Sequence, residues 1–466
     1  MTDPQQTTTA RRSRDDGRRR ALRLPSWRSE SLRTTFWVVP TALIVVAGLL
    51  FAVTVEIDLA AFHHELSLPS WVESGSADAG RQVLIAIAAA IITTVGVVFS
   101  ITILALTLAS QQFGPRMMRN FVRDLGNQMT LGIFVATFVY SVLVLVSITS
   151  LPPANFVPHL SISVAEVLLL VDLAVLIYFI HHIAKSIQLP EVIAGIAHDL
   201  LRAIDAEYPE IRTAGGEVLD PSGHTDELQD MLDKPGAEVA ATHSGYLQFV
   251  GYGQLVEIAE SSDAVIRLAH RPGHFVVAGR PLATVWPAGA ARRVAAALDK
   301  AHVTGPHRTL TQDPVFAIDQ LVEIGIRALS PAVNDTFTAL TCIDWLSAGL
   351  SVVSSRVLAE GVYRGRSGRI RLIEFDPSYG RMVNRAFDKV RQAGRGMPAV
   401  IIRLLDALDH IAESTTDPRQ RAVLLRQAEM ILRGAEEEVP ERLDRVDIRE
   451  RYDRLVHTAR ALDAAR

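Results

Sequence analysis

Four long apolar stretches in the first part of the chain constrain its fold more than any other feature. A transmembrane helix needs about 20 apolar residues, because hydrocarbon is about 30 Å thick and a helix rises about 1.5 Å per residue. Soluble chains rarely place four such stretches within one third of their length, so a buried soluble core is the weaker alternative. The sequence therefore predicts an α-helical integral membrane protein with four transmembrane helices, at residues 36–55, 83–109, 129–149 and 161–180.

The chain before the first stretch has a different character. Residues 1–34 are rich in arginine and poor in apolar side chains, which predicts a basic disordered cytoplasmic tail. A cleaved signal peptide is the alternative for the first stretch, but its apolar run exceeds the usual length of about 7–15 residues. We therefore place a transmembrane domain at residues 35–183.

Basic residues indicate the orientation, because loops rich in Lys and Arg stay in the cytoplasm. The loop after the first stretch is acidic, with Glu56, Asp58 and Glu65, and the loop after the third has no Lys or Arg. Both termini are therefore predicted to be cytoplasmic. The basic side is marked by arginines in the tail and by Arg116, Arg119 and Arg123 after the second stretch.

Those three arginines are candidate contacts for anionic lipid headgroups. The alternative is that they set the topology and nothing else. Gly114 and Pro115 precede them and predict the end of the second helix just inside the cytoplasm.

The remainder of the chain predicts a cytoplasmic α+β region. Residues 184–243 form a linker and helix region, and residues 244–287 form a small β-rich domain, a barrel or sandwich, with "GQLVEIAESS" as a short crossing helix. Residues 288–466 are mainly helical and have the charge pattern of a solvated bundle, interrupted by a strand-like piece at 369–375.

Local signals place two helices at the start of the helical domain. Asp313 is the predicted N-cap of the first, with Pro314 as its first residue, and Asn334 or Asp335 caps the second. Gly325 lies on the apolar face of the first helix. It weakens that helix or lets a neighbouring element approach closely.

The stretch "AVIRLAHRPGHFVVAGRPLATV" resembles the half-barrel of biotinyl and lipoyl carrier domains and of membrane-fusion adaptors. Those carriers need an exposed lysine, and residues 244–287 contain none. The resemblance therefore concerns architecture alone, and we expect no cofactor.

Longer motifs carry a second resemblance. These motifs are "SITILALTLASQQFGPRMMRNFVRD", "RPGHFVVAGRPLATVWP" and "QDPVFAIDQLVEIGIRALSPAVNDTFTALTCIDWL". Through them the chain is similar to bacterial predicted membrane proteins grouped as domain of unknown function 2254. The similarity covers nearly the whole chain after the tail, although Thr336 and His274 depart from the pattern expected there. It implies an integral protein of the bacterial inner membrane with a cytoplasmic C-terminal part, and it implies no activity.

Composition excludes several functions. The net charge of −4 gives no overall basicity, so we expect no nucleic-acid partner. The single cysteine, Cys342, excludes an internal disulfide or an all-cysteine metal site. The chain has no phosphate-binding loop, nucleophile elbow or zinc-protease motif, and we expect it not to be an enzyme.

Asp172 is the main candidate site residue, because it lies near the middle of the fourth stretch, where an ionised carboxylate costs several kcal/mol. It predicts an intramembrane ion or proton site, with Glu166 as a second acidic residue nearer the outer end. The alternative is a neutral Asp172 that hydrogen-bonds a Ser or Thr of another helix.

The second stretch carries the expected partner surface. Thr93, Ser100, Thr107 and Gln111 fall on one side of a helix and form a candidate pore-lining stripe. The alternative is that the stripe supports packing and hydrogen bonds between helices.

Other clusters are weaker. His181 and His182 are adjacent and point in different directions, so an interfacial role is favoured over a metal site. The segment "YRGRSGRIR" places four arginines near a turn, which favours a solvated turn over a phosphate site; they are Arg364, Arg366, Arg369 and Arg371.

Three classes of function remain. The first is an oligomeric channel or small-ion permease, expected to be a homo-oligomer because four spans per chain seldom enclose a path. The second is a membrane-anchored scaffold or sensor whose cytoplasmic domain binds a protein partner. The third, a membrane-surface enzyme, has no catalytic constellation behind it. The polar residues within the apolar stretches favour the first class.

Overall fold

The computed structural model describes residues 37–63, 76–113, 124–150, 156–208, 233–356, 361–374 and 379–464. The chain divides into two compact units, which lie within Pro25–Glu191 and within Val192–Arg466. We call them the N-terminal unit and the C-terminal unit. The predicted basic tail lies outside the described residues, as do Gly114, Pro115 and the three arginines that follow them.

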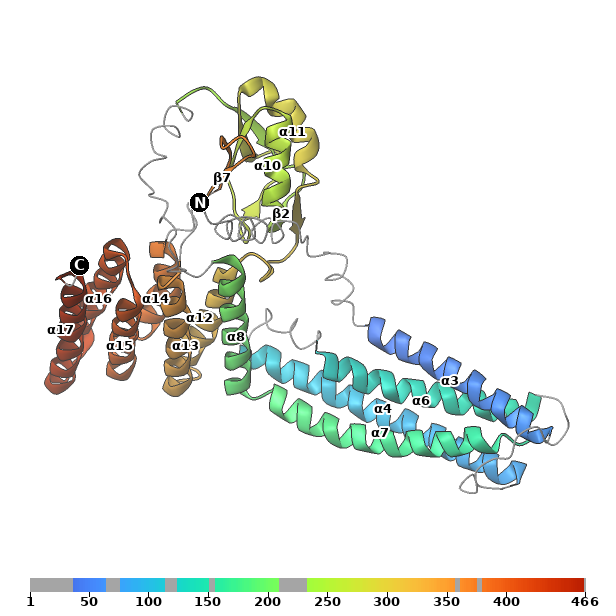
Figure 1. Cartoon of the computed structure of the whole chain (residues 1–466). Coiled ribbons are helices and arrows are strands. Elements are labelled where there is room, and N and C mark those ends of the chain that lie inside the picture. Colours follow the sequence, from blue (N-terminus) through green and yellow to red (C-terminus); the bar gives the residue numbers. More distant parts are fainter. Residues whose placement is uncertain are drawn as a thin grey trace, which may run out of the picture. The chain divides into compact units, whose positions relative to one another are not determined.

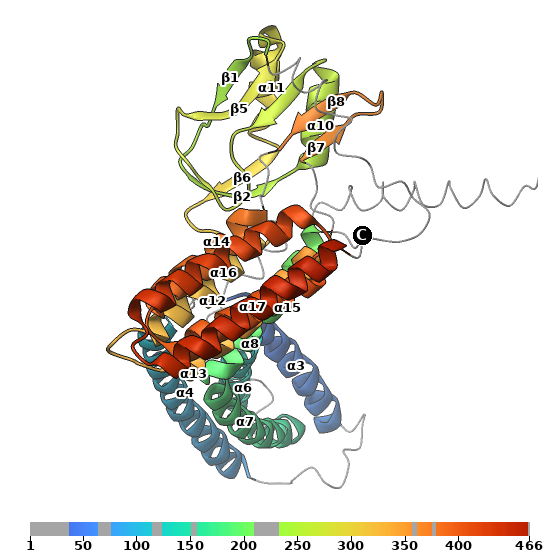
Figure 2. The ribbon, with the colours of Figure 1, turned by 90° about the vertical axis from the view of Figure 1, so that its left-hand side faces the viewer.

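Four long helices form the N-terminal unit, and all four predicted spans are confirmed as helices long and apolar enough to cross a membrane. The central helix, α6, packs against each of the other three. The helices are α3 (Val38–Phe62), α4 (Ala77–Phe113), α6 (Leu125–Ser150) and α7 (His159–Ser186), which lie side by side in Figures 1 and 2. α4, α6 and α7 extend beyond their predicted apolar stretches at both ends, and α3 extends beyond its stretch at the C-terminal end.

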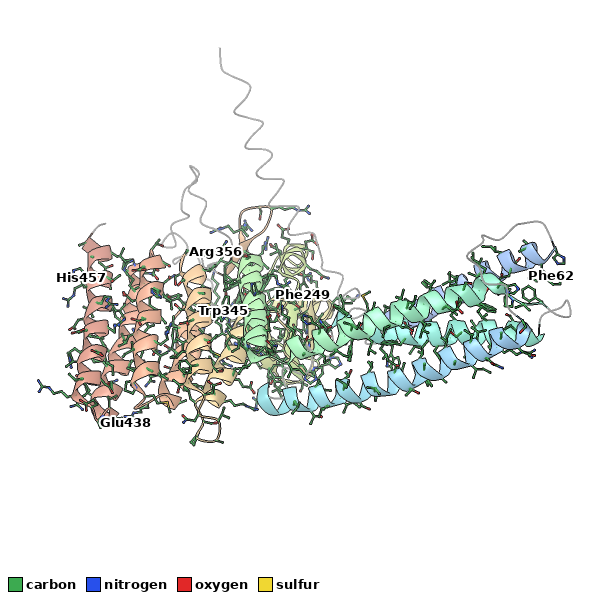
Figure 3. All side chains as sticks on the ribbon, turned by 90° about the horizontal axis from the view of Figure 1, so that it is seen from below. Phe62, Phe249, Trp345, Arg356, Glu438 and His457 are labelled. Atoms are coloured by element: carbon green, nitrogen blue, oxygen red, sulfur yellow. The ribbon has the colours of Figure 1, made fainter. Side chains whose placement is uncertain are left out.

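The interior of this unit is apolar around α6, with Phe134, Tyr140 and Val144 fully buried. Large apolar side chains also project outward all along the helices, as the side-chain view of Figure 3 shows. An apolar exterior on a helical bundle suits a hydrocarbon environment, because water would penalise it.

The first helix of the C-terminal unit is α8 (Leu189–Glu207), of which all residues from Val192 onward belong to this unit. α8 packs along α13 (Thr336–Ser354): the ring of His198 lies 5.8 Å from that of Trp345, labelled in Figure 3, and Arg356 pairs with Asp205 at 2.5 Å. The packing is close at Gly349, where an added Cβ would lie 2.6 Å from a methyl carbon of Leu200.

The strands of this unit form two open sheets, so the described residues contain no closed barrel. One sheet has the order β1-β5-β3-β8-β7, in which only the β3–β8 pair is parallel, and the other has the order β4-β2-β6. The strands are β1 (Ala237–Ala240), β2 (Gly245–Val250), β3 (Val265–Leu268), β4 (Phe275–Val276), β5 (Pro281–Trp286), β6 (His302–Gly305), β7 (Val362–Arg364) and β8 (Ile370–Ile373).

The sheets extend beyond residues 244–287. β1 and β6 flank that range, and the β7–β8 hairpin joins β3 from about 100 residues further along the chain. The predicted crossing helix is confirmed as α10 (Tyr252–Ser261), and α11 (Ala291–Leu298) follows a 3-10 turn at Ala288–Ala290. Both helices lie beside the strands in Figure 2, and their buried apolar side chains belong to the same core as those of the sheets.

Helices make up the rest of the unit, as the charge pattern predicts. Neighbouring pairs include α12 with α13, α13 with α15, and α15 with both α16 and α17. Besides α13, the helices are α12 (Pro314–Ala328), α14 (Tyr379–Ala393), α15 (Pro398–Ser414), α16 (Pro418–Glu438) and α17 (Arg442–Ala464).

α13 is also long and apolar enough to cross a membrane, so five described helices meet that criterion rather than four. Its Ile343, Leu346 and Leu350 are buried, and it packs against α12 and α15. Protein neighbours account for the apolar character of this helix without any lipid contact.

The predicted helix signals have mixed outcomes. Asp335 caps α13 by accepting the Thr338 N–H at 3.1 Å, which confirms that prediction. Asp313 stands at the N-cap of α12, but its carboxylate makes no cap bond, because it receives Arg308 at 2.8 Å instead. At Gly325 an added Cβ would lie 3.5 Å from the Cys342 side chain, which is an ordinary van der Waals distance, so the packing of α12 on α13 does not require a glycine there.

Candidate functional site

The buried polar residues of the N-terminal unit gather on α6, the helix that the other three surround. A helix enclosed by protein can carry polar side chains inside a membrane, because they face other helices rather than lipid. The buried polar side chains of α6 are Asn127, Gln128, Thr130, Thr137, Tyr140, Ser141 and Ser147.

Asp172 of α7 faces this polar side of α6 and is 3% exposed. The Thr137 hydroxyl donates to its Oδ1 at 3.2 Å. Its Oδ2 is buried and receives no hydrogen bond within the described part of the chain, and the same holds for the hydroxyl of Ser141, one turn after Thr137. The predicted hydrogen bond to a Thr of another helix is present, but it comes from the third span and leaves half of the carboxylate unsatisfied.

That arrangement has a clear chemical capacity. A carboxyl group with one oxygen held and the other open can take up a proton or contact a partly dehydrated cation. Asp172 is therefore the candidate functional residue, with Thr137 as the group that orients it.

A second buried carboxylate, Asp58, is fully satisfied. Its oxygens accept the backbone N–H groups of Leu160 (2.8 Å) and Ser161 (2.9 Å) and the Ser161 hydroxyl (2.7 Å). Asp58 thereby caps the start of α7 from the last turns of α3. The Tyr140 hydroxyl extends this network, since it donates to the Ser161 carbonyl at 3.2 Å and bonds Thr54 at 2.9 Å.

Sequence reasoning placed Asp58 in the loop after the first span, and the structure corrects this. α3 continues to Phe62, so Asp58 lies on the helix and turns inward. The one available signal was its position three residues after Val55, which continues the face of the apolar stretch.

The predicted stripe on α4 does not contact the Asp172 site. Thr93, Ser100 and Thr107 are exposed on the outside of the N-terminal unit. Each hydroxyl donates to the carbonyl four residues earlier in its own helix, at 2.8, 2.8 and 2.9 Å. They therefore support no packing between helices of one chain. Gln111 lies on α4, and its side chain falls outside the described part.

The other predicted residues of this unit lie apart from one another. Glu166 is half-buried on α7, toward its start. His181 is exposed, whereas His182 contacts Asp124 at 2.8 Å and stacks on Tyr178, which fits a role at the helix end. Among the described residues, no group of three His, Cys, Asp or Glu side chains could hold a metal ion.

The arginines of the β7–β8 hairpin are partly structural. Arg371 is buried and donates to Asp263 and to the carbonyl of Ala264, so it is not available to a phosphate. Arg364 closes the hairpin by donating to the Gly368 carbonyl at 2.7 Å, while Arg366 and Arg369 are exposed.

The C-terminal unit contains a charged cluster that sequence reasoning missed. Arg308 donates to Asp313 (2.8 Å) and Asp319 (2.5 Å), and Arg385 of α14 donates to Asp319 as well. Burial works to raise the pKa of Asp319, but the hydrogen bond from Arg385 and the charge of Arg308 outweigh it and lower that pKa. The cluster ties the segment before α12 to α14, which is a structural role.

Two glutamates, Glu374 and Glu207, lie near Asp313 of this cluster. Glu374 is held between Tyr252 (2.5 Å) and Tyr363 (2.9 Å), whose rings are stacked. Burial, followed by the charges of Glu374 and Asp313, raises the pKa of Glu207 to about 7. Glu207 ends α8, so a titratable carboxyl group lies at the end of the helix that leaves the N-terminal unit.

Burial and the neighbouring Arg271 lower the pKa of His274 to about 4. This histidine, a residue that departs from the expected family pattern, is therefore neutral near pH 7. No sequence pattern signalled Glu207 or the effect on His274, since both depend on strands and helices far apart in the chain.

The sequence of this chain was compared with those of known proteins, and the result is consistent with the membrane-length helices of the N-terminal unit. Two uncharacterised proteins, one from Mycobacterium bovis and one from Mycobacterium tuberculosis, are each 35% identical to this chain over 378 residues, which is 80% of this chain and 71% of theirs. No solved structure matches the chain. The profile of the family described as "Predicted membrane protein (DUF2254)" matches residues 33–410, so the chain is a member of this family of predicted membrane proteins.

Proposed function

We propose that this protein is an oligomeric channel or small-ion permease of the bacterial inner membrane, with Asp172 as its proton or cation site. The supporting observation is the buried carboxylate that keeps one oxygen without a hydrogen bond in the described chain. A charged side chain within hydrocarbon is costly, and such residues usually mark ion or proton pathways. The proposal assigns the protein no enzymatic activity and no cofactor.

The polar side of α6 supports a path through the interior of the four helices. Thr130, Thr137 and Ser141 supply buried hydroxyls before, beside and after the position that Asp172 faces. Hydroxyl oxygens can replace part of an ion's hydration shell or relay a proton through ordered water.

The exposed stripe of α4 supports a different path. If copies of the chain assemble through α4, the hydroxyls of Thr93, Ser100 and Thr107 would line the space between them. We propose homo-oligomers of this kind, and the two paths are distinguished by experiment below.

We also propose that both termini are cytoplasmic and that the C-terminal unit regulates the flux. The acidic residues Glu65 and Glu73, which follow α3, and the arginines after α4 support this orientation. Anionic lipid contacting Arg116, Arg119 and Arg123 belongs to the same proposal.

The test is ion flux through the purified protein in liposomes, measured for several cations, anions and pH values. Selective flux in protein-containing vesicles and none in empty vesicles supports the proposal. Thr107→Val locates the path, because loss of flux in this variant places it between copies, whereas normal flux leaves it inside the four helices. An absence of flux under all conditions, with the protein folded, contradicts the proposal.

A membrane-anchored scaffold or sensor is the second candidate. It is favoured by Phe337 at the start of α13, which is 83% exposed, next to the exposed Val333. Exposed aromatic residues are frequent anchors of protein partners. Under this alternative Phe337→Ala abolishes partner capture, while Asp172→Asn changes nothing.

A further inference from the structure

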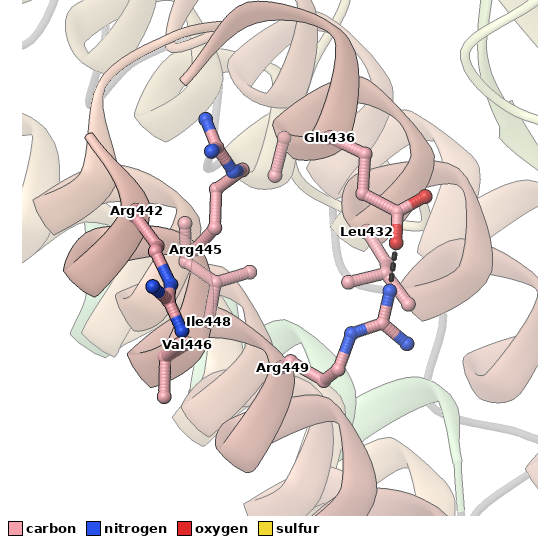
Figure 4. A pocket seen from close by; sticks show the side chains of 8 residues that line it. Leu432, Glu436, Arg442, Arg445, Val446, Ile448 and Arg449 are labelled. Atoms are coloured by element: carbon pink, nitrogen blue, oxygen red, sulfur yellow. Dashed lines mark hydrogen bonds and ion pairs between the residues drawn. The ribbon is translucent and has the colours of Figure 1, made fainter. Parts of the chain in front are cut away.

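A pocket in the C-terminal unit lies between α16 and α17, separate from the residues of the proposed ion path. Its volume is about 210 Å³, which leaves room for several water molecules or for an anion with part of its hydration shell. Apolar side chains such as Leu432 and Ile448 form one part of its lining. Glu436 and three arginines, Arg442, Arg445 and Arg449, form the polar part (Figure 4).

The charges of this lining do not balance. Arg449 is paired with Glu436, the acidic residue of the lining. Arg445 donates to the carbonyls of Val439 (2.6 Å) and Pro440 (2.9 Å), which orient the guanidinium without neutralising it. Arg442 has no hydrogen bond or ion pair in the described part of the chain. Two positive charges of the pocket therefore lack an acidic partner.

The other acidic residues near these arginines in the sequence either bond to other groups or lie outside the lining of the pocket. Glu437 and Glu438 both pair with Arg395, which precedes α15. Glu441 accepts the backbone N–H of Leu443 at 3.1 Å. Asp444 and Asp447 lie on α17 but do not line the pocket. The uncompensated charge is thus available to a ligand.

We propose that this pocket binds a phosphate group, with Arg442 and Arg445 as its ligands. Guanidinium groups match phosphate oxygens in charge and in geometry, and the uncompensated charge of the pair suits a dianion. The Arg445 side chain is already held by two carbonyls, so binding costs less conformational entropy there. Leu432 and Ile448 offer an apolar contact for the rest of a phosphate-bearing molecule.

The pocket residues lie beyond residue 410, where the family profile ends. The inference is therefore independent of the ion path proposed for the N-terminal unit. Phosphate can come from a soluble ion or from a lipid headgroup, and the two sources share this chemistry.

Binding of two probes to the full-length protein in phosphatidylcholine nanodiscs tests the proposal. The probes are inorganic phosphate and a short-chain, water-soluble phosphatidic acid, each measured by equilibrium dialysis. We expect saturable binding that Arg442→Gln and Arg445→Gln each weaken roughly tenfold, as expected for a lost charge-assisted hydrogen bond. Arg460→Gln, an exposed arginine of α17 outside the pocket, is the matched control and leaves binding unchanged.

The ratio of the two affinities identifies the source of the phosphate. Phosphatidic acid that binds at least tenfold more tightly than inorganic phosphate indicates a lipid headgroup, and similar affinities indicate a soluble phosphate. Absence of saturable binding of either probe, or binding that the two pocket variants leave intact, overturns the proposal.

Discussion

Two aspartates inside the same helical unit are used in opposite ways. Asp58 receives three hydrogen bonds at the start of α7, whereas Asp172 receives one and keeps a buried oxygen open. A carboxylate with a structural role needs a hydrogen-bond partner for each oxygen, because a buried polar atom without a partner inside a membrane costs free energy. The incomplete shell of Asp172 is therefore the residue-scale feature that points to function.

Asp58→Ala is expected to destabilise the N-terminal unit. The change removes the side-chain cap of α7 and leaves two backbone N–H groups without a partner, a loss on the order of 3 kcal/mol. Unfolding in mixed detergent micelles measures it. Glu56→Ala, an exposed acid of the same helix, is the control and should change stability by less than about 0.5 kcal/mol. Equal stability of both variants would exclude the capping role.

Glu207 gives a pH-dependent prediction. Its pKa rises from the ordinary 4.5 to about 7 in the folded chain, so folding favours the protonated form. The contribution of Glu207 to the free energy of unfolding is fully present below pH 4.5 and is lost as the pH rises through 7. Glu207→Gln removes this dependence, and the variant is expected to be more stable than the wild type at pH 8 by up to about 3 kcal/mol.

Melting temperatures of the full-length protein at pH 4.5 and pH 8 check this prediction. The exposed Glu257→Gln serves as the control and should follow the wild type at both values. A Glu207→Gln variant that parallels the wild type across this range would show that Glu207 is not titrating there.

The sequence identified Asp172 because its charge interrupts an apolar run. Asp58 was missed because it stands beside other acids at the end of such a run, where a loop explains it equally well. Glu207 had no local signal, since its neighbours Glu374 and Asp313 come from distant elements. Residues whose role depends on long-range contacts are beyond pattern reasoning.

At the scale of elements, the helices were predictable and the sheet pairing was not. Apolar length and caps located α3, α4, α6, α7, α12 and α13, and α10 was predicted as the short helix that crosses between strands. The β7–β8 hairpin pairs with β3 in parallel across a long separation, which no periodicity reveals. The N-cap of α12 was predicted at Asp313 because an Asp-Pro pair usually starts a helix, but an arginine competes for that carboxylate.

Two glycines on α12 and α13 should respond oppositely to alanine. At Gly325 a Cβ meets only ordinary contacts, so Gly325→Ala should stabilise the C-terminal unit by up to about 1 kcal/mol through helix propensity. At Gly349 it would meet a buried Leu200 methyl at 2.6 Å, so Gly349→Ala should cost about 1–3 kcal/mol. Thermal unfolding of both variants measures the difference, and the same sign for both would refute this description of the α8, α12 and α13 packing.

At the scale of the whole molecule, the division into an apolar helical unit and a mixed α and β unit follows from composition along the chain. The two open sheets of the C-terminal unit exclude the closed barrel that was one of the two predicted alternatives, because alternation of strands and turns does not determine whether a sheet closes. Membership of a family of predicted membrane proteins is consistent with the apolar helices of the N-terminal unit. The proposed orientation rests on the positive-inside rule alone.

Cysteine labelling tests the proposed orientation in a Cys342→Ser background. His63→Cys, at the end of α3, should react with a membrane-impermeant maleimide on intact cells. Glu238→Cys, exposed on β1, should react only after the cells are opened. The reverse pattern would place the C-terminal unit outside the cell and contradict the proposed topology.

The proposed role of Asp172 is tested most directly by flux in liposomes that contain wild type, Asp172→Asn or Asp78→Asn at matched amounts of folded protein. Asp78 is an exposed carboxylate at the start of α4 and controls for a general loss of negative charge. We predict that Asp172→Asn loses at least about 90% of the wild-type flux, since an amide cannot carry the proton or the charge, while Asp78→Asn retains it. Wild-type flux that persists unchanged in Asp172→Asn would contradict the assignment of Asp172 as the ion site.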